Sequence, residues 1–221
     1  MDLDEIYLAP RRCLREPVPD LYVCLAHLEN AASALLNGDL KQAEAEICAA
    51  DSQAAHDWID SMWGKRVRWP EQVHYKRVRQ VSDLPVRTGE KDGKIPKEIR
   101  IEAVDRDGFI CRYCQLPVIP KEVRERFRKE LPEAARWGRR NVQQHCGFQA
   151  LWLQFDHVLP ASMGGKATLD NIVVSCAGCN YCKEGYHLQE LGLMDPRQRP
   201  PVASDWDGLV RVLPQGLRTY Q

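Results

Sequence analysis

The first third of the chain alternates apolar and polar residues with the spacing of amphipathic helices. Asn37-Gly38 is a typical stop after one helix, and Asp39 and Asp51 are suitable N-caps for the next two. We therefore expect a small all-α N-terminal domain over residues 1–63. The apolar positions that define its three helices are Leu21, Leu25, Leu28, Ala32 and Leu35, then Leu40, Ala43 and Ile47, then Ala55, Trp58, Ile59 and Met62.

Later in the chain, strand-forming residues replace the helical pattern. Residues 150–159 and 171–175 are rich in strand-forming residues and flank a glycine-containing loop, which predicts a β-hairpin. Residues 176–191 open with a turn and continue as a helix, so that Asn180 falls in its first turn. Together with the N-terminal helices, this pattern predicts an α+β protein.

The remaining segments carry weaker patterns. Residues 64–100 lose the periodicity and combine many lysines and arginines with proline and glycine, which predicts a basic connector, either a solvated linker or a segment that contacts phosphates. Residues 120–144 have the pattern of two further helices, KEVRERFRKEL and EAARWGRRNVQQ. We expect residues 195–221, with several prolines and Trp206, to form an irregular C-terminal tail.

The charges are distributed unevenly although their formal sum is zero. Residues 1–63 hold 12 acidic and 4 basic residues, residues 64–150 hold 12 and 21, and residues 151–221 hold 7 and 6. An acidic head followed by a basic middle indicates a nucleic-acid surface in the middle of the chain.

Two broad classes of protein are disfavoured. No apolar run approaches the roughly 18 to 20 residues that span a bilayer, and the acidic N-terminus does not resemble a secretory signal. We therefore expect a cytoplasmic protein with no membrane association. Nine cysteines in such a protein argue for metal binding rather than for disulfides, because cytosolic thiols are kept reduced.

Two CxxC turns carry the clearest metal-binding pattern. Cys111 and Cys114 form one pair, and Cys176 and Cys179 form the other, so that together they supply four thiolates for one tetrahedral zinc. Four protein ligands leave no position for water, so this zinc is expected to be structural. Three nearby residues remain alternative ligands: His145, Cys146 and Cys182.

Between and after the pairs stand Asp156-His157, Gly164-Gly165, Asn171 and Asn180, in that order. This ordered set resembles the HNH endonucleases in their His-Asn-Asn form, over about 90 of the 221 residues. The resemblance implies a ββα-metal nuclease domain over residues 101–194, stapled by the four-cysteine zinc site. This sequence places 41 residues between Cys114 and Asp156, more than we expect in a compact member of the family. The difference predicts a helical insertion at residues 117–149.

Phosphodiester hydrolysis requires a deprotonated water, a neutralised phosphate and a stabilised leaving oxygen. His157 suits the general base, because imidazole titrates near neutral pH. Asp156 is the expected carboxylate ligand of one magnesium or manganese ion. By resemblance, Asn180 completes that metal site, and Asn171 orients the imidazole of His157. Candidate DNA contacts are Lys183, Arg136, Arg139 and Arg140.

These features favour a metal-dependent DNA endonuclease, whose helical N-terminal domain binds a protein partner or regulates cleavage. The alternative is a non-catalytic zinc-containing DNA-binding module. Such a module has no use for Asp156, His157 and the two asparagines together, whereas an endonuclease needs all four. An adaptor that acts through the acidic helices alone leaves the cysteine pairs unexplained. Restriction and phage defence are among the settings in which this kind of domain occurs.

Overall fold

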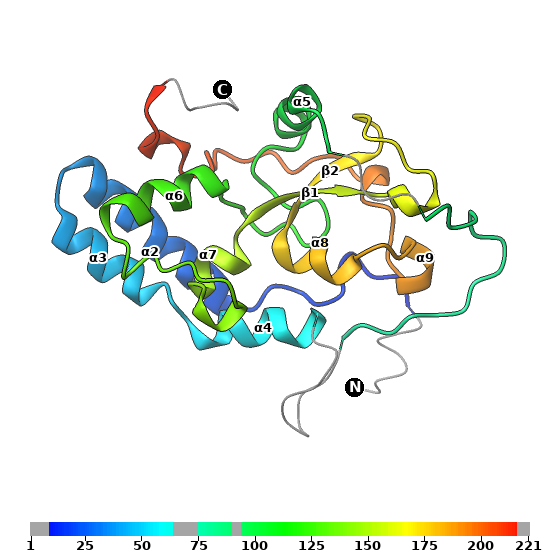
Figure 1. Ribbon diagram of the computed structural model, residues 1–221, viewed down its shortest axis with the longest axis horizontal. Coiled ribbons are helices and arrows are strands. Elements are labelled where there is room, and N and C mark those ends of the chain that lie inside the picture. The colour runs from blue at the N-terminus through cyan, green and yellow to red at the C-terminus, as the bar shows by residue number, and fades with distance from the viewer. Residues whose placement is uncertain (1–8, 64–74, 90–93, 216–221) are drawn as a thin grey trace.

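The computed structural model describes residues 9–63, 75–89 and 94–215 (Figure 1). None of the helices in these ranges is both long and apolar enough to cross a bilayer. The helices and strands are α2 (Pro19–Leu36), α3 (Leu40–Ala49), α4 (Gln53–Trp63), α5 (Lys97–Asp107), α6 (Lys121–Glu130), α7 (Cys146–Ala150), β1 (Leu153–His157), β2 (Ile172–Cys176), α8 (Ala177–Lys183) and α9 (Leu188–Leu191). Short 3-10 turns lie at Asn141–Gln143, Ala161–Met163, Pro196–Gln198 and Val210–Val212.

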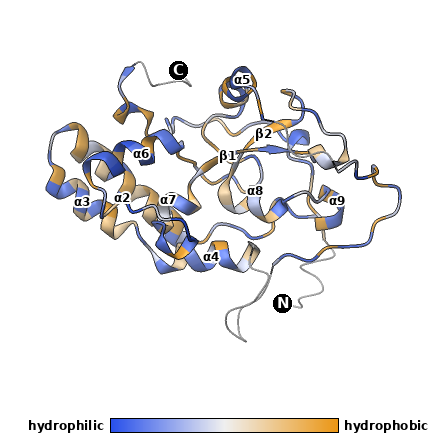
Figure 2. Cartoon of the chain, in the orientation of Figure 1, coloured by the Kyte–Doolittle hydropathy of each residue, from blue (hydrophilic) through white to orange (hydrophobic). Residues whose placement is uncertain are grey.

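The centre of the molecule is a two-stranded hairpin with a helix on it. β1 and β2 pair antiparallel, with Asp156 opposite Val173 and His157 opposite Ile172. α8 begins immediately after β2 and packs against both strands, and α5 packs against β2 (Figure 1). β2 is hydrophobic along most of its length and fully buried, whereas α6 is mostly hydrophilic (Figure 2). The predicted α+β class and the ββα arrangement are therefore confirmed.

The N-terminal helices pack directly onto this unit. α2, α3 and α4 form at the predicted positions, and α4 contacts both α7 and α8. The buried ring of Trp58 lies so close to Gly178 that a Cβ there would come within 2.6 Å of it. One hydrophobic core runs from Cys13 to Leu213, so the expected domain boundary at residue 63 does not coincide with a break in the core.

The expected connector and insertion differ from the structure in detail. α5 begins at Lys97, before the expected end of the connector at residue 100. In the insertion, residues 121–130 form α6, but residues 132–140 form a turn, an isolated bridge at Trp137 and a bend instead of the second helix. Pro132 accounts for the end of α6, because the residue before a proline is disfavoured in helical conformation, and Gly138 lowers the helical propensity of the segment that follows.

Two of the connector's described cations form ion pairs within the fold. Lys76 pairs with Glu184 at 2.8 Å, and Arg87 pairs with Glu190 at 3.1 Å. The backbone of the same segment is fixed as well, since the Arg79 amide donates to the Glu190 carbonyl at 2.7 Å. Residues 64–74 and 90–93 of the connector lie outside the described ranges.

Residues 195–215 of the tail form two 3-10 turns within otherwise irregular chain and pack over the core. The Trp206 indole donates to the Val118 carbonyl at 3.0 Å, and Leu209, Val210 and Val212 are buried. Arg199 donates to the Arg112 carbonyl at 2.7 Å, which ties the tail to the first CxxC turn.

His145 joins the N-terminal helices to the insertion. Its buried ring shares a hydrogen bond of 2.8 Å with the Ile47 carbonyl through Nε2, and its Nδ1 accepts from the Phe148 amide at 3.2 Å. A carbonyl only accepts and an amide only donates, so these partners select the neutral tautomer with the proton on Nε2. Burial lowers the pKa of His145 to about 4.

This histidine predicts a pH-dependent stability. In the unfolded chain His145 is protonated as the pH falls below about 6.5, whereas in the folded chain it stays neutral down to about pH 4. Protonation therefore favours the unfolded chain, and the stability of the fold that is present at pH 7 decreases as the pH falls through this range. Between pH 7 and pH 5 the free energy of unfolding should fall by about 2 kcal/mol more in the wild type than in His145→Gln. Urea unfolding at both pH values measures this difference. Parallel losses in the two proteins would contradict the assignment.

Candidate active site and zinc centre

The four predicted cysteines meet in the interior. Their Sγ atoms all lie within 4.8 Å of one another, and all four side chains are buried. The sulfurs of Cys114 and Cys176 are 3.7 Å apart. A tetrahedron with zinc–sulfur bonds of about 2.3 Å has edges of about 3.8 Å, so this spacing fits one zinc ion. Within the described residues, no other group of His, Cys, Asp and Glu comes together in this way.

The two cysteine pairs come from separate parts of the fold. Cys111 and Cys114 lie in the turn after α5, while Cys176 ends β2 and Cys179 lies in the first turn of α8. The first turn is held tight by a hydrogen bond of 2.9 Å from the Gln115 amide to the Cys111 carbonyl. A zinc ion at this position would therefore join the start of the domain to the hairpin and its helix.

The three alternative zinc ligands have other roles. Both ring nitrogens of His145 are engaged with the backbone, as described above, and Cys146 is the first residue of α7. Cys182 is buried on α8, where desolvation raises the pKa of its thiol well above the usual range. None of the three belongs to the four-cysteine group.

The zinc assignment predicts about one zinc per chain by elemental analysis. Cys176→Ser should lose the metal and much of the stability, because structural zinc contributes to folding directly. Cys146→Ser is the matched control and should keep full zinc content and a normal melting temperature. Full zinc content in Cys176→Ser would show that the ligand set is different.

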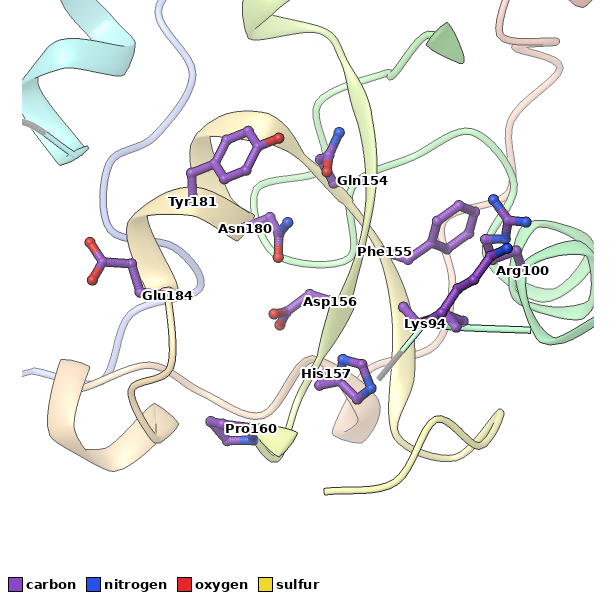
Figure 3. Close-up of a pocket in the computed structure, with 11 residues that line it drawn as sticks. Lys94, Arg100, Gln154, Phe155, Asp156, His157, Pro160, Asn180, Tyr181 and Glu184 are labelled. Carbon is purple, nitrogen blue, oxygen red and sulfur yellow. The ribbon is translucent and has the colours of Figure 1, made fainter. Parts of the chain in front are cut away.

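A cleft of about 420 Å³ opens between β1 and the first turns of α8 (Figure 3). Asp156, His157 and Asn180 all line it, and the Asn180 amide and the Asp156 carboxylate face each other across it (Figure 3). Lys94 and Arg100 lie on its opposite side. The structure thus brings three of the four expected polar site residues into one cavity.

Asp156 is held from two sides. The Tyr113 hydroxyl donates to its Oδ2 at 2.6 Å, and the Lys183 ammonium donates to its Oδ1 at 3.1 Å. Burial raises the pKa of Asp156 above its usual value, and the charge of Lys183 partly opposes this shift. Tyr113 lies between the two cysteines of the first CxxC turn, so the zinc cluster and the carboxylate share one rigid element.

The expectation that Lys183 contacts DNA is corrected by its position. Its side chain is only 1% exposed, and its ammonium also donates to the His157 carbonyl at 2.7 Å. A lysine in this position cannot reach a phosphate on the surface. It fixes Asp156 and the backbone of His157 relative to each other, a role that its spacing from Asn180 did not indicate.

Asn171 also differs from its expected role. Its Oδ1 accepts from the Leu159 amide at 2.8 Å, and its Nδ2 donates to the carbonyls of Leu159 and Lys166, both at 3.0 Å. These bonds fasten the loop between the strands rather than the imidazole of His157. Gly165 completes the closure, because a Cβ there would lie 1.8 Å from the Leu159 carbonyl oxygen.

The three candidate arginines of the insertion fall into two groups. Arg136 forms an ion pair with Asp51, so its charge joins the insertion to the N-terminal helices. Arg139 and Arg140 are exposed. Only these two of the three keep a side chain available for a phosphate without breaking an ion pair that the structure shows.

Comparison with known families agrees with this geometry. A family model described as HNH endonuclease matches residues 144–194. The match covers both strands, α8 and the four polar residues of the expected site. No curated protein and no solved structure matches the chain. Residues 144–194 are therefore similar to HNH endonuclease domains, a similarity that indicates nuclease activity, and the residues before and after them lie outside the match.

The buried pair of Asp156 and Lys183 predicts strong coupling. Lys183→Met leaves a buried carboxylate without its cation and should lower the free energy of unfolding by about 3 to 5 kcal/mol. The double variant Asp156→Asn, Lys183→Met should cost about 1 to 3 kcal/mol less than the sum of the single variants. Urea unfolding without added magnesium tests this. Additive single effects would show that the pair contributes no interaction of its own.

Proposed function

We propose that the protein is a metal-dependent DNA endonuclease that hydrolyses phosphodiester bonds in the cleft beside β1. One observation carries the proposal: Asp156, His157 and Asn180 line a single cleft within a domain matched as HNH endonuclease. His157 acts as the general base, and Asp156 and Asn180 hold the divalent cation.

The donors in the cleft fit magnesium or manganese. One carboxylate and one amide oxygen suffice for magnesium, which keeps most of its waters and accepts oxygen ligands. The Lys183 ammonium beside Asp156 is an opposing charge, so we expect modest metal affinity. The bound ion would neutralise charge on the phosphate and on the leaving oxygen.

The residues in and around the cleft have different roles in the proposed reaction. His157 takes a proton from the attacking water, and Lys183 keeps the backbone of His157 at a fixed distance from Asp156. Asn171 and Gly165 close the loop that follows His157. These contacts would position the base for the attacking water.

Positive charge near the cleft supports a nucleic-acid substrate. Lys94 and Arg100 line the cleft, and Arg139 and Arg140 add exposed charge on the insertion. Cations so placed attract the phosphate backbone irrespective of sequence. One domain with one cleft cuts one strand at a time, so nicking is the expected activity of a single chain.

A second candidate function has one observation in its favour. Both carboxylate oxygens of Asp156 already accept hydrogen bonds from Tyr113 and Lys183. A non-catalytic zinc-containing DNA-binding module would keep such a pair as part of its core. The two candidates differ in whether the protein cuts DNA in the presence of magnesium.

The nuclease proposal predicts nicking of supercoiled plasmid with Mg²⁺ or Mn²⁺. His157→Ala should slow it by about 10²- to 10⁴-fold, the usual effect of losing a general base, while zinc content and DNA binding persist. His27→Ala, the same change on α2, should cut at the wild-type rate. Gel electrophoresis of the plasmid forms measures both.

Two further outcomes separate metal binding from proton transfer. Asp156→Ala should recover part of its activity at high Mg²⁺, whereas His157→Ala should not. Wild-type nicking by His157→Ala would refute the assigned base. No cleavage by the wild type with either metal, together with salt-sensitive DNA binding, would favour the non-catalytic module.

A further inference from the structure

A second cavity, also of about 420 Å³, adjoins the catalytic cleft. The two cavities share Tyr181 and Glu184, so they form neighbouring parts of one surface depression. The volume of the second cavity falls within the range of about 300 to 1,000 Å³ that is typical of small-ligand sites. The remaining lining residues are Asn141, Gln144, Gln149 and Trp152, of which the first three belong to the insertion.

Aromatic rings form one part of this cavity. Trp152 lies edge-on to Trp137 at 5.5 Å between ring centroids and to Tyr181 at 6.2 Å. The buried guanidinium of Arg124 lies 3.6 Å from the centroid of Trp137 and 4.8 Å from that of Trp152. These contacts hold Trp152 in a fixed orientation, so α6 and the segment after it act as the support of an aromatic surface.

A chain of carboxamides forms the other part. Gln144 donates through Nε2 to the Gly138 carbonyl at 3.2 Å and accepts through Oε1 from Gln149 Nε2 at 3.0 Å. Because a carbonyl only accepts, this chain fixes the orientation of both amides. Gln149 Oε1 then remains without a hydrogen-bond partner, on a side chain that is only 2% exposed.

An unpartnered buried acceptor is costly, and it calls for an explanation in a folded protein. A ligand with an N–H donor on a flat ring would satisfy the acceptor and stack on the aromatic residues at the same time. Nucleobases have this combination, and aromatic stacking together with hydrogen bonds to base edges is how proteins bind unstacked bases. The catalytic cleft next to the cavity is where a nucleic-acid strand would run.

We propose that the insertion builds a pocket for one unstacked nucleobase of the substrate, adjacent to the bond that is cut. Trp152 and Tyr181 provide the stacking surfaces, and Gln149 Oε1 accepts from an N–H group on the base edge. The proposal rests on the proposed nuclease function for its placement beside the scissile bond. Base binding itself requires no cleavage and is tested separately.

The test uses the full-length, zinc-loaded protein labelled with ¹⁵N, titrated with single nucleosides and followed by NMR. 2′-Deoxyadenosine should shift the indole signal of Trp152 and the side-chain amide signal of Gln149. The deoxyriboside of unsubstituted purine, which lacks the exocyclic amine, should bind about 2- to 10-fold more weakly, the usual contribution of one hydrogen bond. Deoxyribose alone should shift neither signal.

Matched variants identify the groups that bind. Gln149→Met, which preserves the side-chain volume, should bind both nucleosides equally, and Gln42→Met on α3 should retain the wild-type preference. Should Gln149→Met fail to fold, Tyr181→Leu and Tyr181→Phe provide the second test. The leucine variant should lose about 10-fold in affinity for both nucleosides, and the phenylalanine variant should bind as the wild type does.

Two results would contradict the proposed base pocket. One is the absence of any change in the NMR signals of Trp152 and Gln149 at saturating nucleoside, and the other is equal affinity of the wild type for the two nucleosides. Plasmid nicking without nucleoside binding would refute the pocket and leave the nuclease proposal intact. Nucleoside binding without any nicking would refute the nuclease proposal and leave the pocket intact.

Discussion

The arrangement of the hairpin, α8 and the cleft depends on the cluster formed by four buried cysteines. The hairpin of β1 and β2 is only five residues long on each strand, too small to hold a helix and a long loop in place by apolar burial alone. One zinc ion bound by Cys111, Cys114, Cys176 and Cys179 would fix the first CxxC turn, β2 and α8 at once. It would also fix Tyr113, whose hydroxyl donates to Asp156, so the same cluster would position a residue of the cleft.

Buried Lys183 links the two elements that form the walls of the cleft, β1 and α8. A buried lysine requires a partner, and its contacts with Asp156 and the His157 carbonyl tie the last turn of α8 to the end of β1. Burial raises the pKa of Asp156, and the charge of Lys183 partly opposes that rise.

The sequence predicted those features that depend on short spacings. Two CxxC turns, an Asp-His pair at a strand end and an asparagine one turn into a helix are local patterns, and the structure places all of them together. The roles of Lys183 and Asn171 depend on which atoms the fold brings within hydrogen-bond distance of their side chains, and spacing does not contain that information. The second helix expected in the insertion is absent, and Gly138 in the middle of that segment lowers its helical propensity.

Contacts with the N-terminal helices hold the insertion in place. Arg136 pairs with Asp51, the His145 ring bonds to the Ile47 carbonyl, and the Cys146 amide donates to Asp51 at 2.8 Å. α2, α3 and α4 therefore anchor the segment whose Gln144 and Gln149 line the second cavity and whose Trp137 contacts Trp152. The N-terminal helices also reach the four-cysteine cluster, since Trp58 of α4 lies against Gly178, between Cys176 and Cys179. They are thus placed to support both the proposed base pocket, through Asp51 and Ile47, and the proposed zinc site, through Trp58.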